Sequence, residues 1–227
     1  MGNVGFREFL NFERPDPELV ELFRGIPSPN VDDNMNRLYA MSSGMRAYNT
    51  TPLLGVAFTV KTPSGDNLMF NHALDVAQPG DIIVVDSAAC MERALCGEIM
   101  VQYAISRKLG GFVINGCVRD IDAIAQLPFP VYALGHTPNG PLKNGAGEIG
   151  VPVVAGGLVV MPGDILVGDQ DGITVVRPAD AREVAAKARK QNEGEAGILA
   201  DISKMNREGI WKAVAAKGCD MQSSYNG

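Results

Sequence analysis

The sequence has few of the residue types from which several common functional sites are built. It contains only two histidines, His72 and His136, so a site with three histidine ligands cannot form within one chain. We expect both to be structural or loop residues. Its cysteines stand apart, with no Cys-x-x-Cys pair among them: Cys90, Cys96, Cys117 and Cys219. This spacing argues against a zinc knuckle or a dithiol redox motif and favours reduced, partly buried thiols.

Long hydrophobic runs and an excess of basic residues are also absent. No apolar segment approaches the ~20 residues that span a bilayer. Residues 1–20 lack the basic stretch and apolar run of a signal peptide. The 20 Lys and Arg residues stand against 26 Asp and Glu, and the resulting net charge of −6 disfavours a nucleic-acid surface. We therefore expect a cytoplasmic protein that binds neither membranes nor nucleic acids.

What is present is the composition of a folded globular protein. Of the 227 residues, 46% are hydrophobic and 20% are charged, which suits one domain with a sizeable core. No Ser/Gly-rich linker divides the chain. We predict a single domain over residues 1–227, with a core at about 15–178 and a C-terminal helical arm, rich in Ala, Lys, Arg and Glu, at 179–227.

Strand-like and helix-like segments alternate through most of the core. Short β-branched runs predict strands at 55–61, 81–86, 112–115 and 131–134. Apolar residues at helical spacing predict helices at 17–23, 31–41, 67–77, 97–109 and 121–127. The segment 116–120 is predicted to be a turn. This alternation predicts an α/β domain.

Two glycine-containing segments lie further along the chain. Pro-Gly-Asp-Ile-Leu-Val-Gly-Asp at 162–169 resembles the segment at 79–86 and runs through Asp171-Gly172 into Ile-Thr-Val-Val, which predicts a hairpin. Gly-Ala-Gly-Glu-Ile-Gly at 145–150 has the spacing of a dinucleotide-binding motif. It precedes a strand instead of opening a helix, so we interpret it as a loop that approaches another group closely.

Two further segments carry groups suited to an anionic ligand or a cation. Residues 97–100 begin a predicted helix, where backbone N–H groups attract a carboxylate or phosphate. The alternative is an ordinary helix start. Arg119 and Asp120 follow a predicted strand, at the edge where α/β sheets bind ligands. The carboxylate of Asp120 could bind a hard cation, and the guanidinium of Arg119 could donate two hydrogen bonds to a substrate carboxylate. The alternative is that Asp120 caps the following helix and that Arg119 is a solvated side chain.

Several motifs keep one order and spacing along residues 55–195. They are Gly-Asp-Asn at 65–67, Gly-Glu at 97–98, Lys-Leu-Gly-Gly-Phe-Val-Ile-Asn-Gly-Cys-Val-Arg-Asp at 108–120, Phe-Pro-Val at 129–131, Val-Pro-Val at 151–153, Pro-Gly-Asp at 162–164 and Asp-Gly-Ile-Thr-Val-Val at 171–176. Together they resemble the RraA-like family. That family includes 4-hydroxy-4-methyl-2-oxoglutarate / 4-carboxy-4-hydroxy-2-oxoadipate aldolases and a non-enzymatic regulator that binds ribonuclease E.

The resemblance implies an α/β/α sandwich of the swivelling β/β/α type, assembled as homotrimers or dimers of trimers. It implies a Mg²⁺- or Mn²⁺-dependent pyruvate aldolase that cleaves 4-hydroxy-2-oxo acids and decarboxylates oxaloacetate as a side activity. The alternatives are a regulator that binds an RNA-processing protein and an enzyme with only the decarboxylase activity.

The resemblance also implies roles for individual residues. Asp120 would bind the metal, and Arg119 would contact a substrate oxygen. Glu98 would support a water on the metal, and the backbone amides of Gly97, Glu98, Ile99 and Met100 would hold the pyruvate carboxylate. A glutamate from a neighbouring subunit's terminal helix would complete the site; gapless counting gives Glu195, with Glu193 as the alternative.

The chain departs from the aldolase pattern at one position. The pattern has an acid three residues after the metal-binding aspartate, and this sequence has Ala123 there. Asp122 is adjacent but lies about 100° away around a helix. We therefore expect weakened metal binding.

Overall fold

The computed structural model describes residues 3–219, which fall into two compact units divided after Arg189. The first unit holds every strand described below and the site. The second contains the last part of α6 (Ala181–Ala200), the short 3-10 helix η1 (Ile202–Lys204) and α7 (Glu208–Ala216). Residues 181–200 and 208–216 of the arm predicted at 179–227 are helical, and its residues 220–227 lie outside the described part of the chain. Within residues 3–219, no helix is both long enough and apolar enough to cross a bilayer.

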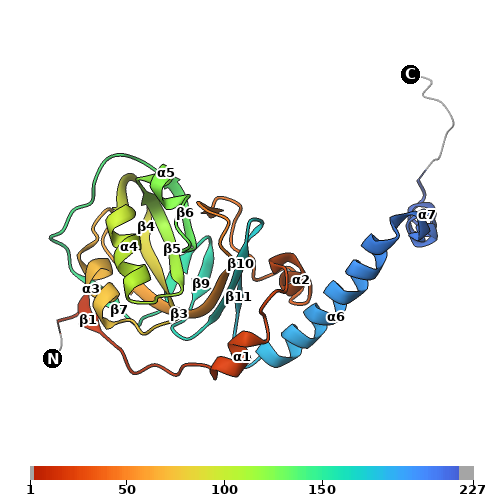
Figure 1. Ribbon diagram of the computed structural model, residues 1–227, viewed down its shortest axis with the longest axis horizontal. Coiled ribbons are helices and arrows are strands. Elements are labelled where there is room, and N and C mark those ends of the chain that lie inside the picture. Colours follow the sequence, from red (N-terminus) through yellow and green to blue (C-terminus); the bar gives the residue numbers. More distant parts are fainter. Residues whose placement is uncertain (1–2, 220–227) are drawn as a thin grey trace, which may run out of the picture. The chain divides into compact units, whose positions relative to one another are not determined.

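A mixed sheet forms the centre of the first unit, and it confirms the predicted α/β fold (Figure 1). Four neighbouring strands are parallel: β3 (Leu53–Lys61), β4 (Asp81–Cys96), β5 (Gly111–Val118) and β6 (Val131–His136). The far side of β3 is shared by two antiparallel partners, β7 (Gly147–Ile149) and β10 (Ile165–Asp169). The edges are β1 (Phe6–Glu8), parallel to β7, and β2 (Arg46–Ala47), antiparallel to β6.

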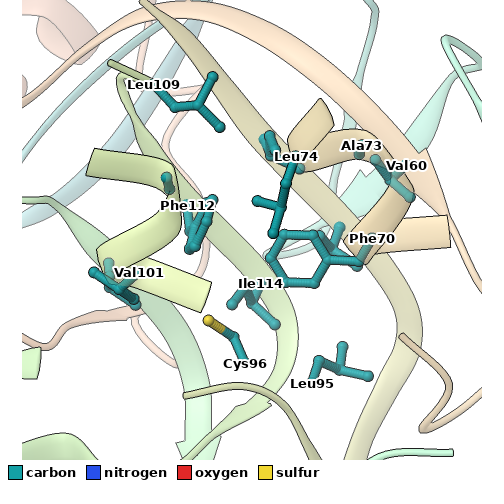
Figure 2. Close-up of a cluster of buried hydrophobic side chains, with 14 of the residues drawn as sticks. Val60, Phe70, Ala73, Leu74, Leu95, Cys96, Val101, Leu109, Phe112 and Ile114 are labelled. Carbon is teal, nitrogen blue, oxygen red and sulfur yellow. The ribbon is translucent and has the colours of Figure 1, made fainter. Parts of the chain in front are cut away.

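Helices cover one face of the parallel strands. They are the predicted connections α3 (Leu68–Val76), α4 (Glu98–Ser106) and α5 (Ile121–Ile124). Figure 2 shows part of the apolar cluster beneath them, in which Phe112 is fully buried. Its ring meets those of Phe70 and Phe129 edge-on, at centroid distances of 5.1 and 4.9 Å. This cluster fixes the helices against the sheet and so positions the loops at their ends.

Strands pack on the opposite face. The hairpin β8 (Val153–Ala155) and β9 (Leu158–Val160) covers a second apolar cluster with β10 and β11 (Gly172–Val176). The predicted hairpin at 162–176 is present as β10 and β11, with Gln170 and Asp171 in its turn. A third cluster joins β10 and β11 to α1 (Pro17–Glu21), α2 (Ser28–Asp33) and the start of α6.

Two sequence-based predictions about secondary structure are wrong. The helix expected at 31–41 is α2, which ends at Asp33, because the backbone of Asn36 and Arg37 enters the left-handed region (φ 58° and 59°). Residues 116–118 of the turn expected at 116–120 are instead the end of β5. A Cβ at Gly116 would lie 3.2 Å from the carbonyl oxygen of Cys90, so the glycine allows close pairing with irregular β4 instead of a turn.

The glycine-rich segment at 145–150 forms no nucleotide loop, and its expected close approach to another group is confirmed, although its centre is a strand and not a loop. Its centre is β7, which pairs with β1 and β3 and opens no helix. A Cβ at Gly147 would lie 2.5 Å from the carbonyl oxygen of Lys61 and 2.8 Å from Cγ of Met69. Glycine is needed because the backbones of adjacent strands approach at this point.

Candidate active site

The residues of interest gather at the carboxyl ends of β3, β4 and β5. A cavity of about 170 Å³ opens there, and its walls come from the loop before α3, the start of α4, the residues after β5 and the loop 137–146. Five of the predicted site residues line this cavity: Gly97, Ile99, Met100, Arg119 and Asp120. The fold thus brings together two segments that are separated by about twenty residues in the sequence.

Asp120 occupies the N-cap position of α5, but its side chain does not cap that helix. The residue is left-handed (φ 58°, ψ 38°), and this conformation turns the carboxylate toward α4. There its Oδ2 atom accepts a hydrogen bond from the backbone N–H of Glu98 at 3.1 Å. The side chain remains 44% exposed, so the carboxylate is available to a ligand in the cavity.

Arg119 accompanies the carboxylate and gives the cavity a positive group. Its Nε atom lies 3.7 Å from Oδ2 of Asp120, and its side chain is also 44% exposed. The backbone N–H of Arg119 bonds to the carbonyl of Cys96, which holds the end of β5 against the end of β4. Because the backbone is fixed and the guanidinium is half-exposed, Arg119 can pair with an anionic ligand beside Asp120.

Gly97 is required by this close packing. Its backbone is extended, but a Cβ there would overlap Oδ2 of Asp120 and lie 3.1 Å from Cγ and Nε of Arg119. The glycine therefore lets the start of α4 approach the Arg119–Asp120 pair. Its role is steric and does not depend on unusual backbone dihedral angles.

The first turn of α4 has fewer free N–H groups than the sequence implied. Those of Glu98 and Met100 bond to Oδ2 of Asp120 and to the carbonyl of Gly97, respectively. Within the described part of the chain, the N–H of Ile99 has no such partner. The positive end of this nine-residue helix thus presents the Ile99 N–H as its available donor.

Three residues that the sequence analysis did not select also line the cavity: Asn67, Asn71 and Lys143. Asn67 is 2% exposed; its Nδ2 donates to the carbonyl of Leu95 at 2.8 Å, whereas its buried Oδ1 has no hydrogen-bond partner among the described residues. A buried oxygen without a partner is uncommon and indicates a place for water or a ligand. The Gly-Asp-Asn motif at 65–67 was the only sequence signal for this residue.

Asp66 holds the loop that carries Lys143. Its Oδ2 accepts the backbone N–H groups of Asn144 and Gly145 at 2.8 and 2.7 Å, and its Oδ1 accepts that of Leu68 at 2.9 Å. The side chain therefore ties the cavity wall to the start of α3.

Cys96 lines the cavity but is not arranged as a nucleophile. Burial, together with the nearby charge of Asp120, raises the pKa of its thiol above the usual range. A thiol that keeps its proton is a poor nucleophile and a poor metal ligand. The cysteines are free, as predicted, with Cys90, Cys96 and Cys117 buried and Cys219 exposed.

A second cavity of about 250 Å³ shares Arg119 and Asp120 with the first. Its other walls are Ile121, His136, Thr137 and Pro138. Arg119 and Asp120 therefore belong to the walls of both cavities.

The remaining predicted residues lie elsewhere. The Glu98 side chain is outside both described cavity linings, and so are Ala123 and Asp122 on α5. Glu195 and Glu193 belong to α6 in the second unit, where Glu195 accepts a hydrogen bond from Gln191 at 2.9 Å. A role for these glutamates in a neighbouring subunit's site stays a prediction.

The donor set suits one kind of cation. Among residues 3–219 no three His, Cys, Asp or Glu side chains cluster as metal ligands. Of the described residues that line the cavity, Asp120 is the one that offers an exposed carboxylate. Magnesium keeps most of its waters and binds through one or two carboxylates and substrate oxygens, so this sparse set fits Mg²⁺ or Mn²⁺.

The fold and this sheet-edge site define an α/β protein with a small-ligand cavity at the ends of parallel strands. Residues 28–175 match the RraA-like family described as Aldolase/RraA. A protein of Halalkalibacterium halodurans named "Putative 4-hydroxy-4-methyl-2-oxoglutarate aldolase" is 37% identical over 175 residues, which cover 77% of this chain and 83% of that protein. The chain therefore belongs to the RraA-like family, and the resemblance inferred from its motifs is confirmed.

Solved structures share the same fold. Streptomyces coelicolor RraAS2, described as an unusual member of the RNase ES inhibitor RraA protein family, superposes with a TM-score of 0.73 at 28% identity and covers 86% of this chain and all of its own. The RNA-processing inhibitor RraA from Thermus thermophilis gives a TM-score of 0.61 at 26% identity, covering 66% of this chain and 91% of its own. The chain is thus similar in fold to proteins named as inhibitors and similar in sequence to a protein named as a putative aldolase.

Proposed function

We propose that this protein is a divalent-metal-dependent pyruvate aldolase that cleaves 4-hydroxy-2-oxo acids, such as 4-hydroxy-4-methyl-2-oxoglutarate. One observation carries the proposal: the hydrogen bond from Glu98 N–H to Asp120 joins a carboxylate, a guanidinium and a helix N-terminus at one cavity. These are the groups that a 2-oxo acid and its cation need. The curated relative's name supports the same substrate class.

Asp120 would hold Mg²⁺ or Mn²⁺, which supplies positive charge beside the keto oxygen of the substrate when bound. Arg119, next to Asp120, would pair with that oxygen and stabilise the negative charge that develops on it as the carbon–carbon bond breaks. The N–H of Ile99 and the positive end of α4 would hold the substrate carboxylate. Together these contacts orient the pyruvyl half of the substrate.

Cleavage also needs a proton to move. The 4-hydroxyl loses its proton, the bond between C3 and C4 breaks, and the electron pair passes to C3 and the keto oxygen. A proton returned to C3 then gives pyruvate and a second oxo compound. Because the Glu98 side chain lines neither cavity, a water held by Glu98 and by a neighbouring subunit's Glu195, or Glu193, would take this proton and return it. A homotrimer or a dimer of trimers would supply the second glutamate. Oxaloacetate decarboxylation develops the same charge, so we expect it as a side activity.

The direct test is pyruvate release from 4-hydroxy-4-methyl-2-oxoglutarate and from oxaloacetate, with magnesium and with EDTA. We expect release from both with magnesium and loss of both with EDTA. Release from oxaloacetate alone would identify a decarboxylase. EDTA-resistant release would contradict the metal requirement.

A second candidate function is regulation of an RNA-processing protein, and the names of the two structural neighbours favour it. The same preparation would then inhibit RNA cleavage by a ribonuclease E-type enzyme and release no pyruvate at any magnesium concentration. Pyruvate release without inhibition would exclude it.

A further inference from the structure

We infer that the second cavity is the subsite for the distal, anionic half of the substrate, and that His136 is its recognition residue. This inference rests on the proposed function, because it concerns the part of the substrate that does not become pyruvate. It adds a residue that the aldolase assignment does not itself require.

The position of the cavity supports this assignment. The bond that breaks lies between the two halves of the substrate, so the reacting centre must lie where their binding sites meet. Arg119 and Asp120 line both cavities and form that boundary. If the first cavity takes the pyruvyl half, the second is left for the other half.

The fold explains why His136 reaches this boundary. In the parallel pairing of β5 with β6, His136 lies opposite Val118, the residue directly before Arg119. The register thus brings the end of β6 next to the residue before Arg119, and His136 and Arg119 line the same cavity although they are 17 positions apart in the sequence. His136 is exposed at the end of β6, whereas the beginning of the strand is buried.

The lining determines what the cavity can bind. Besides Asp120, its polar or charged side chains are Arg119, His136 and Thr137, and all three can donate hydrogen bonds. Ile121 and Pro138 add apolar walls. This combination fits a carboxylate accompanied by a small alkyl group on the carbinol carbon, and fits a long neutral chain less well.

A neighbouring tyrosine orients the histidine. The hydroxyl of Tyr48 lies 3.3 Å from Nδ1 of His136, and the two rings meet edge-on at 84°. Burial raises the pKa of Tyr48, so the phenol keeps its proton and can donate it to Nδ1. When Nδ1 accepts this hydrogen bond, the ring carries a proton on Nε2, which can donate to a ligand carboxylate.

The test compares substrates that differ only in the distal half. In His136→Ala, we expect kcat/KM for 4-hydroxy-4-methyl-2-oxoglutarate to fall about tenfold, the loss typical of one hydrogen bond to a charged group. The kcat/KM for oxaloacetate, from which only carbon dioxide leaves, should change less than about twofold. His136→Gln retains an N–H donor near the same position and should recover most of the loss.

Two controls and a binding measurement complete the experiment. His72→Ala removes the other histidine, which pairs with Glu8 and lines a separate cavity. This variant should leave kcat/KM unchanged for both substrates. Calorimetric titration with magnesium should show a Kd for 2-oxoglutarate about tenfold higher in His136→Ala, and an unchanged Kd for pyruvate. Tyr48→Phe should give part of the same loss.

The outcomes separate the two proposals. An equal loss of kcat/KM with both substrates in His136→Ala, or no loss with either, would overturn the subsite proposal. Pyruvate release by the wild type would still support the proposed aldolase function. If the wild type releases no pyruvate from either substrate, the proposed function fails and the subsite fails with it.

Discussion

The Oδ2 atom of Asp120 lies 3.1 Å from the backbone nitrogen of Glu98, and this contact joins the end of β5 to the start of α4. The donor is at the positive end of a helix, and the hydrogen bond fixes the direction of the carboxylate. The left-handed backbone of Asp120 makes the contact geometrically accessible. One hydrogen bond thus assembles the centre of the candidate site.

Asp120→Asn should abolish most activity and leave the fold intact. The amide oxygen can still accept from Glu98, but the amide nitrogen then faces the cavity, where a hard cation needs an oxygen ligand. We expect pyruvate release to fall at least about 100-fold. Circular dichroism and the melting temperature check the fold. Asp171→Asn, on an exposed residue in the turn between β10 and β11, is the matched control and should retain activity. Wild-type turnover by Asp120→Asn at limiting magnesium would show that Asp120 is only a structural residue.

Gly97→Ala should damage the site through packing alone. The added methyl group overlaps the Asp120 carboxylate, so the start of α4 or the carboxylate must move. A displacement of about 1 Å at a reacting centre can reduce turnover about 100-fold. Gly209→Ala, in α7 with no atoms near its Cβ position, is the control and should leave kinetics unchanged. Normal kinetics in Gly97→Ala would contradict the proposed packing role.

Subunit mixing tests the predicted contribution of Glu195. Asp120→Asn and Glu195→Ala should each be inactive alone. After the two are mixed and subunit exchange is confirmed, some interfaces carry both wild-type residues, and pyruvate release should return in part. Glu193→Ala mixed in the same way tests the alternative. If no activity returns with either pair, these glutamates do not complete a neighbouring site.

Ala123→Asp should strengthen metal binding. Ala123 lies one turn after Asp120 in α5, and its N–H bonds to the carbonyl of Asp120 at 3.1 Å. An acid at this position can accept a hydrogen bond from the cation's hydration shell, a contribution of typically 10–100-fold. We expect the half-saturating magnesium concentration for pyruvate release to fall about tenfold. Ala125→Asp, at the exposed end of α5, should not change it. An unchanged magnesium requirement in Ala123→Asp would indicate that another carboxylate, Asp122 first among them, accepts this hydrogen bond.

Arg177→Met should destabilise the fold in a pH-dependent way. Asp164 is 2% exposed and accepts hydrogen bonds from Arg177 and from the backbone N–H of Met161. Burial raises the pKa of Asp164, and Arg177 acts in the opposite direction. Loss of Arg177 leaves a buried carboxylate without its cation, at a cost of about 3 kcal/mol near neutral pH.

The sign of the pH dependence follows from the raised pKa. A carboxyl whose folded pKa lies above its unfolded value contributes fully to stability at low pH, and that contribution is lost as pH rises through the folded pKa. Urea unfolding should therefore show a smaller effect of Arg177→Met near about pH 5 than at about pH 7. In the Asp164→Asn background the difference between the two pH values should disappear. An effect that is equal at both pH values would contradict this explanation.

Several structural features were predictable because they depend on local patterns. The strand ending before Arg119 and the helix beginning after Gly97 follow from side-chain periodicity, which reflects burial on one face. Asp120 was identified from its position after a strand. The length of β5 was underestimated because Gly116 has the local signature of a turn, whereas its role is to let β4 approach closely.

By itself the sequence determined the α/β class, the family and the Arg119–Asp120 pair, because these depend on composition, periodicity and ordered motifs. Only the tertiary structure decided that the Asp120 carboxylate accepts a hydrogen bond at the start of α4 instead of capping α5. It also decided that Asn67 and Lys143 line the first cavity and that His136 and Arg119 line the second. These relationships arise from strand register and left-handed backbone geometry, which place residues far apart in the chain within a few ångströms. Local sequence does not encode such distances, because they are set by the packing of the whole sheet.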